Sequence, residues 1–240
     1  MKKIIVLFAL SLSLYSFGQT IVEYPSKDKL LITADLYETE NTDTFILLFH
    51  QAGSSRGEYQ EIAPKLNALG YSCLAVDQRS GNVSNGIKNQ TKQRAKQQGK
   101  KTKYIDAFPD IEASVAYIKE KYAPKKIIIW GSSYSSSLVL KYAGEYPTAV
   151  QAAISFSPGE YFGSKNFIAE SAQHITAPTF ITSSRGERKS WSTINENIAS
   201  EKKQTFVPKG SGNHGSKALW SSKPDHKEYW EAVTAFLKTI

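Results

Sequence analysis

The chain has 240 residues, a formal net charge of +8 and a single cysteine. One cysteine excludes an internal disulfide, so the fold must be held together by core burial, which a single domain of this length can supply. The charge suggests nucleic acid as a partner, but seven basic residues and no acidic one lie between positions 88 and 103, and the rest of the chain is nearly neutral.

This basic segment, residues 88–103, is predicted to be a solvated helix or loop. Glutamines are interleaved with its lysines and Tyr104 follows only at its end, so it lacks the stacking aromatic rings of a single-strand nucleic-acid binder. We therefore expect no nucleic-acid partner. An anionic substrate or an acidic polymer of the cell envelope is the alternative ligand for this segment.

Residues 1–18 have the composition of a secretory signal peptide. Two lysines precede an apolar run over residues 4–14, and small residues follow up to Gly18. The run is too short to span a bilayer. We expect cleavage after Gly18, export to the periplasm or the medium, and one mature domain over residues 19–240 without a stable membrane anchor. An uncleaved anchor is the alternative.

Apolar, strand-like runs alternate with helical segments along the rest of the chain. After a first strand pair within residues 30–37, the predicted strands are residues 45–49, 72–76, 127–130, 152–156, 178–182 and 204–207. The predicted helices are residues 58–69, 107–122, 134–145, 192–198 and 223–238. This alternation favours an α/β fold with a mostly parallel, doubly wound sheet and helices on both faces. We expect the polar loop after the strand 72–76 to border the site; pairing of Asp77 with Arg79 to hold the loop is the alternative.

Residues 127–135 predict a buried strand that breaks sharply into a helix at Ser133. In a G-x-S-x-G elbow, a tight turn forces the serine into a strained backbone conformation, and small neighbours let the strand and the helix approach closely. Gly131 matches this pattern, and Ser135 replaces the second glycine with another small residue. We predict that Ser133 is a nucleophile.

A serine hydroxyl becomes a good nucleophile when a base takes its proton, and a carboxylate must orient that base. On such a sheet the three residues follow in the order serine, acid, histidine. His50 and His174 precede the segment where the base belongs, which leaves His214 and His226. Because His214 lies in a glycine-rich loop and His226 lies at the start of a helical pattern, we predict His214 as the base.

The acid is predicted to be a glutamate, since no aspartate lies between Ser133 and His214. Glu187 follows closely on the carboxyl end of the predicted strand 178–182, where open parallel sheets collect functional groups. It is the first choice. Glu160 follows the end of another predicted strand and is the alternative.

These motifs, together with the turn His50-Gln51-Ala52-Gly53, resemble the α/β-hydrolase superfamily in its small dienelactone-hydrolase-like branch, over about residues 30–238. The resemblance implies an α/β-hydrolase fold and an oxyanion hole made by the backbone amides of Gln51 and Tyr134. It gives His50 a structural role. Dienelactone hydrolases themselves use a cysteine nucleophile, whereas Cys73 here lies within a predicted strand as a small buried hydrophobe.

The segment 157–177, where large hydrolases carry a lid domain, is too short for one and implies a minimal lid. Its Tyr161 and Phe162, with Trp191, are candidates to line the substrate site; ordinary core packing is the alternative. A shallow, open site favours small or short-acyl substrates.

The sequence therefore predicts an exported serine hydrolase that cleaves a small carboxylic ester through an acyl-enzyme on Ser133. We expect neither a metal nor another cofactor, because the histidines are scattered and no nucleotide-binding glycine loop is present. A peptidase or amidase acting through the same residues is one alternative. A catalytically inactive binding module with a hydrolase fold is the other.

Overall fold

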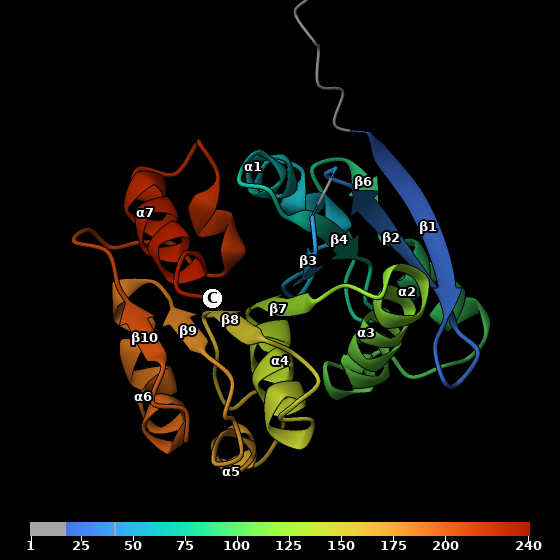
Figure 1. Ribbon diagram of the computed structural model, residues 1–240. Helices are drawn as coiled ribbons and strands as arrows, with labels where there is room; N and C mark the ends of the chain where they lie inside the picture. The colour runs from blue at the N-terminus through green and yellow to red at the C-terminus, as the bar shows by residue number, and fades with distance from the viewer. Residues whose placement is uncertain (1–17, 41) are drawn as a thin grey trace, which may run out of the picture.

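The computed structural model describes residues 18–40 and 42–240. The predicted signal peptide lies outside the described residues except for Gly18. The described part forms one eight-stranded sheet in the order β1-β2-β4-β3-β7-β8-β9-β10, with a separate small hairpin of β5 and β6 (Figure 1). Within it, no helix is both long and apolar enough to cross a bilayer.

The strands are β1 (Gln19–Pro25), β2 (Leu31–Tyr37), β3 (Thr44–Phe49), β4 (Ser72–Val76), β5 (Val83–Ser84), β6 (Ile87–Lys88), β7 (Lys126–Ser132), β8 (Ala152–Phe156), β9 (Thr179–Thr182) and β10 (Lys203–Phe206). The α-helices are α1 (Ile62–Ala68), α2 (Gln90–Gln97), α3 (Phe108–Tyr122), α4 (Tyr134–Glu145), α5 (Phe167–Ala172), α6 (Arg188–Asn197) and α7 (His226–Leu237). Short 3₁₀ helices include η1 (Arg56–Tyr59), η3 (Arg185–Glu187) and η4 (Ser216–Leu219).

The sheet is parallel from β4 through β10, and only β1 and β2 run antiparallel to their neighbours. The mostly parallel sheet expected from the sequence is confirmed. The first strand pair is wrong in extent, because β1 begins at Gln19 and pairs with β2 along its whole length. As an edge strand, β1 buries few of its side chains, so its sequence carries a weak apolar pattern.

Helices cover both faces of the sheet, and alternate strand residues supply the two cores. In β7, Ile127 and Ile129 pack in the core beneath α3, α4, α5 and α6, while Ile128 and Trp130 pack in the other core beneath α1 and α7 (Figure 1). This two-sided burial explains why the central strands are almost continuously apolar. Cys73 is fully buried within β4, as expected.

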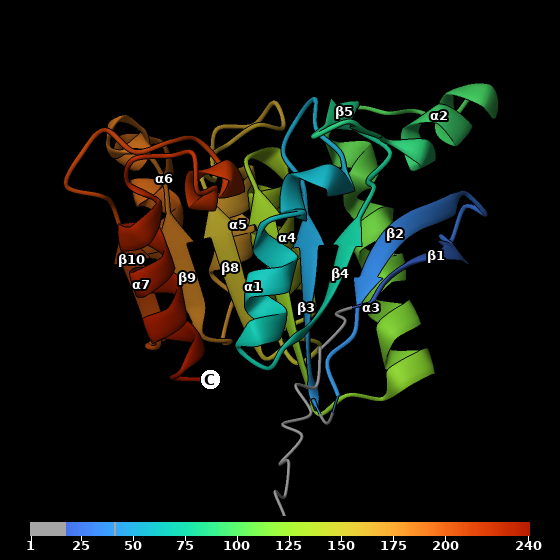
Figure 2. The same ribbon diagram turned by 90° about the horizontal axis from the view of Figure 1, so that it is seen from above.

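The parallel strands all end at one edge of the sheet, where their following loops gather (Figure 2). The register pairs Phe49 of β3 with Gly131 of β7, and Ser132 of β7 with Phe156 of β8. Phe156 pairs in turn with Thr182 of β9. The residues that follow these strand ends therefore emerge side by side.

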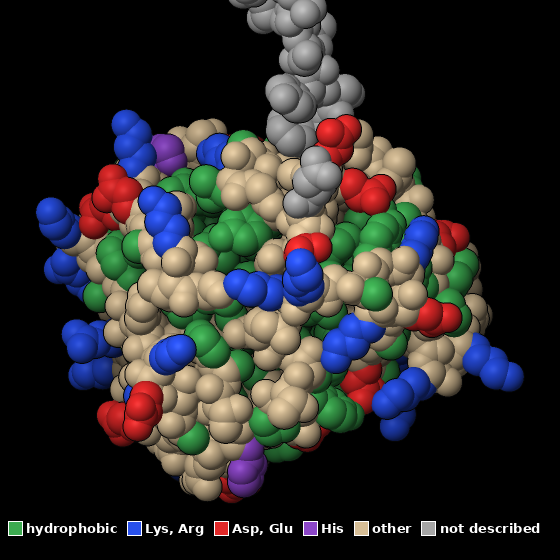
Figure 3. Space-filling model, viewed as in Figure 1, with side chains coloured by type: hydrophobic (Ala, Val, Ile, Leu, Met, Phe, Trp, Pro, Cys, Tyr) green, Lys and Arg blue, Asp and Glu red, His purple; other side chains and the backbone are tan. Residues whose placement is uncertain are grey.

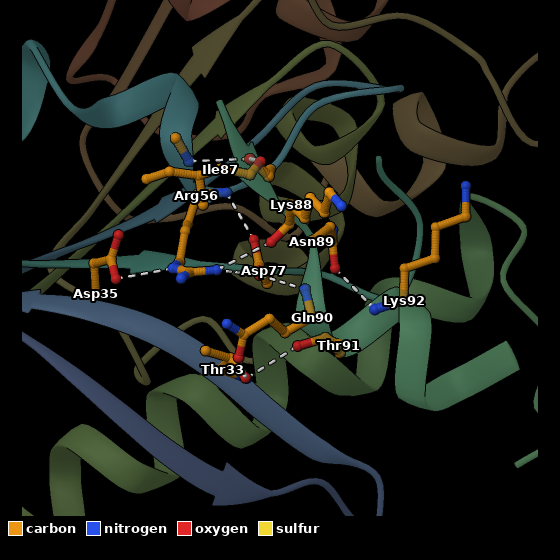
Figure 4. Close-up of polar contacts among 12 residues, drawn as sticks. Thr33, Asp35, Arg56, Asp77, Ile87, Lys88, Asn89, Gln90, Thr91 and Lys92 are labelled. Carbon is orange, nitrogen blue, oxygen red and sulfur yellow. Dashed lines mark hydrogen bonds and ion pairs between the residues drawn. The ribbon is translucent and has the colours of Figure 1, made fainter. Parts of the chain in front are cut away.

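The basic segment is anchored to the sheet by a buried ion-pair cluster (Figure 4). The Arg56 guanidinium pairs with Asp35 at 2.8 Å and with Asp77 at 2.6 Å, and all three side chains are almost fully buried. Asp77 also accepts the backbone amide of Gln90 at 2.8 Å, which fixes the start of α2. Much of the basic segment is thus a helix held against the sheet by its first turn.

The alternative interpretation of the loop after β4, a pair between Asp77 and Arg79, is not observed. Arg79 binds Asp110 of α3 at 2.7 Å and Asp28 at 2.8 Å instead, because Arg56 already occupies Asp77. On the face seen in Figure 3, Lys and Arg side chains are scattered among Asp and Glu and form no continuous patch of one sign.

We expect Arg56→Met to destabilise the protein strongly. Removing the guanidinium leaves two buried carboxylates without their cation, and breaking a buried pair in this way costs about 3 to 5 kcal/mol of unfolding free energy. Urea unfolding measures the loss. Lys27→Met is the control, because the Lys27 amine pairs with Glu112 at the surface and an exposed pair contributes at most about 1 kcal/mol. Equal losses for the two variants would contradict this account.

Candidate active site

Ser133 stands in a strained turn between β7 and α4. Its backbone has φ 59° and ψ −125°, a region that non-glycine residues rarely adopt. The Ser133 amide donates to the Phe156 carbonyl of β8 at 2.7 Å, which ties the turn to the neighbouring strand. Ser133 is 7% exposed, so only a small part of the side chain reaches the surface.

The residues on either side of Ser133 explain how the turn is tolerated. A Cβ atom at Gly131 would lie 2.4 Å from the Ser135 carbonyl oxygen, so this position needs glycine. Ser135 has its own function in the turn, since its hydroxyl donates to the Phe49 carbonyl at 2.6 Å and accepts the Ser132 amide at 2.9 Å. The serine that replaces the second glycine therefore links the ends of β3 and β7.

His214 is paired with Glu187 across two loops. The imidazole Nδ1 lies within hydrogen-bonding distance of Glu187 Oε1, and both side chains are partly exposed. Glu187 also accepts the Ser157 hydroxyl at 2.8 Å and the Ser184 amide at 3.1 Å. Burial alone would raise the pKa of Glu187, but the bonds from His214 and Ser157 outweigh it and lower the pKa to about 2. An ionised carboxylate at Nδ1 favours the proton on that nitrogen and leaves Nε2 as a base.

The loop that carries His214 is fastened to the serine turn immediately after the histidine. The Gly215 amide donates to the Ser157 hydroxyl at 2.9 Å, and the Ser216 amide donates to the Ser132 hydroxyl at 2.8 Å. Within residues 18–40 and 42–240, Glu187 is the only side chain that hydrogen-bonds His214. The structure thus brings the His214 loop against Ser132, the residue that precedes Ser133. No hydrogen bond joins the side chains of Ser133 and His214 in the described residues. Catalytic hydrogen bonds often form fully only when substrate binds.

Of the two backbone amides expected to form an oxyanion hole, one is free within the described structure to donate a hydrogen bond to a substrate oxygen and the other is already bonded. Tyr134 is the first residue of α4, and its amide has no hydrogen-bond partner among the described residues. The Gln51 amide, in contrast, donates to the buried Glu58 carboxylate at 2.9 Å. The next amide in the turn, that of Ala52, has no partner in the described part of the chain. The role of Glu58 could not be predicted, because no local sequence pattern marks a carboxylate that accepts the backbone amide of a residue seven positions earlier.

Two other candidates have structural roles. His50 is fully buried, and burial lowers its pKa to about 4, so the ring is neutral. It accepts the Gln78 amide at 3.1 Å and braces the turn, as expected. Glu160 accepts the amides of Ile168 and Ala169 at the start of α5, and the structure does not bring it to His214.

A cavity of about 540 Å³ is connected to Tyr134, the residue after Ser133, through a wall residue that stacks on it. Its wall consists of Thr102, Lys103, Tyr104, Ile105, Tyr161 and Phe162. The Tyr104 ring stacks on the Tyr134 ring with centroids 4.6 Å apart, and the Tyr161 hydroxyl donates to the Ser157 carbonyl at 2.9 Å. The cavity wall therefore contacts Tyr134, which follows Ser133, and Ser157, which hydrogen-bonds Glu187.

The cavity wall only partly matches the sequence expectation. Tyr161 and Phe162 line it, but Trp191 is 3% exposed, donates to the Ser183 hydroxyl at 2.8 Å and packs in the core. Residues 102–105 were missed as wall residues. Their only sequence signal is the aromatic Tyr104 at the end of the basic segment. No cluster of three or more metal-ligating side chains occurs in the described residues.

The chain matches one protein family and is similar in fold to several solved structures. The family described as alpha/beta hydrolase fold matches residues 44–234. A search of curated proteins found none that matches the chain. Among solved structures, an esterase from Pyrococcus furiosus is similar with a TM-score of 0.69 at 18% identity, over 93% of both chains.

Two further structures share the architecture. A dienelactone hydrolase from Anabaena variabilis has a TM-score of 0.72 at 14% identity, over 92% of this chain and 97% of that one. A Butyrivibrio proteoclasticus protein with bound ferulic acid has a TM-score of 0.67 at 15% identity, over 88% of this chain and 96% of that one. At such identities the likeness concerns the fold. The family match spans most of the chain and confirms the resemblance seen in the sequence: this protein belongs to the α/β-hydrolase family.

Proposed function

We propose that this protein is an exported serine hydrolase that cleaves small carboxylic esters through an acyl-enzyme on Ser133. The observation that carries the proposal is the pairing of His214 with an ionised Glu187 on a loop fastened beside the strained turn of Ser133. The signal-like composition of residues 1–18 supports export. The structural likeness to esterases supports an ester substrate.

The proposed reaction has two steps. In the first, His214 Nε2 takes the proton of Ser133 as the serine oxygen attacks the ester carbonyl, and the imidazolium then protonates the departing alcohol. In the second, His214 takes a proton from water as the water attacks the acyl-enzyme, and the imidazolium then returns that proton to the departing Ser133 oxygen, which releases the acid and restores both side chains. Glu187 holds the tautomer of His214 and stabilises its charged form.

The negative charge that develops on the carbonyl oxygen needs donors that are free. The amide of Tyr134 meets this condition at the positive end of α4. We assign the second donor to Ala52 in place of Gln51, because the Gln51 amide already serves Glu58. Each such donor is typically worth about 100- to 1000-fold in turnover.

The cavity supports a small, flat apolar group on the ester. Its volume lies within the range of ligand pockets, roughly 300 to 1000 Å³. Three of its six wall residues are aromatic, and aromatic rings pack well against planar groups. The similar fold that holds ferulic acid is consistent with an aromatic acyl group.

Ser133→Ala should abolish esterase activity. Without the hydroxyl no acyl-enzyme forms, so turnover of p-nitrophenyl acetate by the purified mature protein should fall on the order of a million-fold. A fluorophosphonate probe should also fail to label the variant. Ser192→Ala is the control, because that hydroxyl donates within α6 to the Lys189 carbonyl and has no part in the proposed reaction, and this variant should retain activity and labelling. Activity that survives Ser133→Ala would refute the proposal.

Glu187→Gln should depress turnover far more than Glu160→Gln. Loss of the carboxylate removes the orientation of His214, and losing the acid of such a triad costs about 10⁴-fold. Glu160→Gln should act on stability alone, by about 0.5 to 2 kcal/mol, since that carboxylate caps α5. Turnover numbers and melting temperatures of the two variants separate these effects. The reverse ranking of turnover would move the role of the acid to Glu160.

Phe162→Ala should discriminate between acyl groups. If the cavity holds the acyl part, the variant should raise KM for p-nitrophenyl benzoate by about 10-fold or more while leaving hydrolysis of the acetate within about threefold, because a buried aromatic contact is worth about 1 to 3 kcal/mol. Steady-state kinetics on both esters measure the difference. Equal effects on the two substrates would show that the cavity does not bind the acyl group.

A further inference from the structure

A second glutamate lies under the serine turn, and the proposed reaction does not use it. Glu58 belongs to η1, and its side chain is fully buried. One carboxylate oxygen accepts the Ser132 hydroxyl at 2.7 Å, and the other accepts the Gln51 amide at 2.9 Å. A buried carboxylate needs such donors to offset its desolvation. Both of these donors come from segments that flank the site.

Ser132 connects Glu58 to a third segment, the loop that carries His214. Its hydroxyl donates to Glu58 and accepts the Ser216 amide at 2.8 Å, two residues after His214. The Trp130 indole donates to the Ser216 hydroxyl at 2.9 Å and strengthens this junction. Glu58 is therefore joined to the loop of the proposed base through a single serine.

The same arrangement occurs a second time one residue away. The Ser157 hydroxyl donates to Glu187 at 2.8 Å and accepts the Gly215 amide at 2.9 Å. Two carboxylate–serine pairs thus hold two consecutive amides directly after His214. One pair contains the carboxylate that contacts the imidazole, and the other contains a carboxylate buried beneath the serine turn.

We propose that Glu58 is a positioning residue that fixes the turn after β3, the end of β7 and the His214 loop relative to one another. The inference rests on the proposed function, since it assigns Glu58 to the same reaction. By holding the Gln51 amide, Glu58 sets the orientation of that peptide and leaves the Ala52 amide as the donor for the oxyanion. Glu58 is not among the residues that line the cavity.

This role predicts a specific kinetic effect. Loss of the Glu58 bonds lets the turn and the His214 loop shift, and misplacement by about 1 Å can cost about 100-fold in rate. The cavity wall, in contrast, comes from residues 102–105, Tyr161 and Phe162, and among the described residues none of these hydrogen-bonds Glu58. Transition-state stabilisation should therefore fall while ground-state binding persists.

The test compares Glu58→Gln, Ser132→Ala and their double variant on p-nitrophenyl acetate, with enzyme concentrations set by fluorophosphonate titration of active sites. Each single variant should lose about 10- to 100-fold in kcat with KM within about threefold of the wild type. The double variant should lose little more than the worse single variant, because both residues act as one unit. Glu61→Gln is the control: its carboxylate also joins the first helix to the C-terminal segment, through Ser221, but at the surface. It should keep the wild-type kcat.

The outcomes separate this inference from the proposed function. If Glu58→Gln and Ser132→Ala both keep kcat within about twofold of the wild type at equal titre, Glu58 is not a positioning residue. A drop that Glu61→Gln shares would overturn it too, by showing a general effect on folding. If Glu58→Gln does not fold, Ser132→Ala alone decides, since it removes a single hydroxyl. Activity that survives Ser133→Ala would instead remove the proposed function itself.

Discussion

The backbone conformation of Ser133 is the constraint on which the rest of the site depends. Holding a serine at φ 59° costs of order 1 to 3 kcal/mol, and the surrounding structure must supply that energy. Three features do so: the missing side chain of Gly131, the hydroxyl of Ser135 bonded to β3, and the amide bond to Phe156 of β8. The two hydrogen bonds tie the turn to two different strand ends, and Gly131 leaves room for the close approach, so the turn cannot relax without disturbing the sheet.

Serine hydroxyls connect the loops around this turn. A hydroxyl can donate and accept at once, so it can join a carboxylate to a backbone amide, whereas a carboxylate alone only accepts. Ser132 and Ser157 both act in this way, and both follow from the shared edge of the parallel strands, where β7 and β8 end in register. The resulting network sets the position of the His214 loop from two sides.

Much of the fold could be predicted because its signals are local, and the proposed site residues are predicted from signals of the same kind. The apolar strands, the break at Ser133, the glycine-rich loop of His214 and the position of Glu187 after β9 are all legible over a few residues. In a parallel sheet, strand ends meet at one edge, so the chain order alone suggests that these loops approach each other.

The parts that could not be predicted depend on partners far away in the sequence. Asp77 pairs with Arg56, 21 residues upstream, and not with its near neighbour Arg79. The Gln51 amide is occupied by a glutamate that no motif marks. Trp191 follows Glu187 closely along the chain but turns into the core. In each case, neighbouring residues in the sequence are poor guides because packing in three dimensions selects the partner.

The basic segment shows how an apparent binding feature can have a different role. Its helix α2 is held at the sheet by the Asp77 carboxylate, and Arg94 pairs with Glu23 on the edge strand. The chain then leaves the helix and reaches the site, where the Lys103 amide is capped by Asp106 and the Tyr104 ring stacks on Tyr134. The positive charge of Arg94 is thus paired in a contact that holds α2 against β1. The chain that follows the segment thus places the Tyr104 ring against Tyr134, the residue after Ser133.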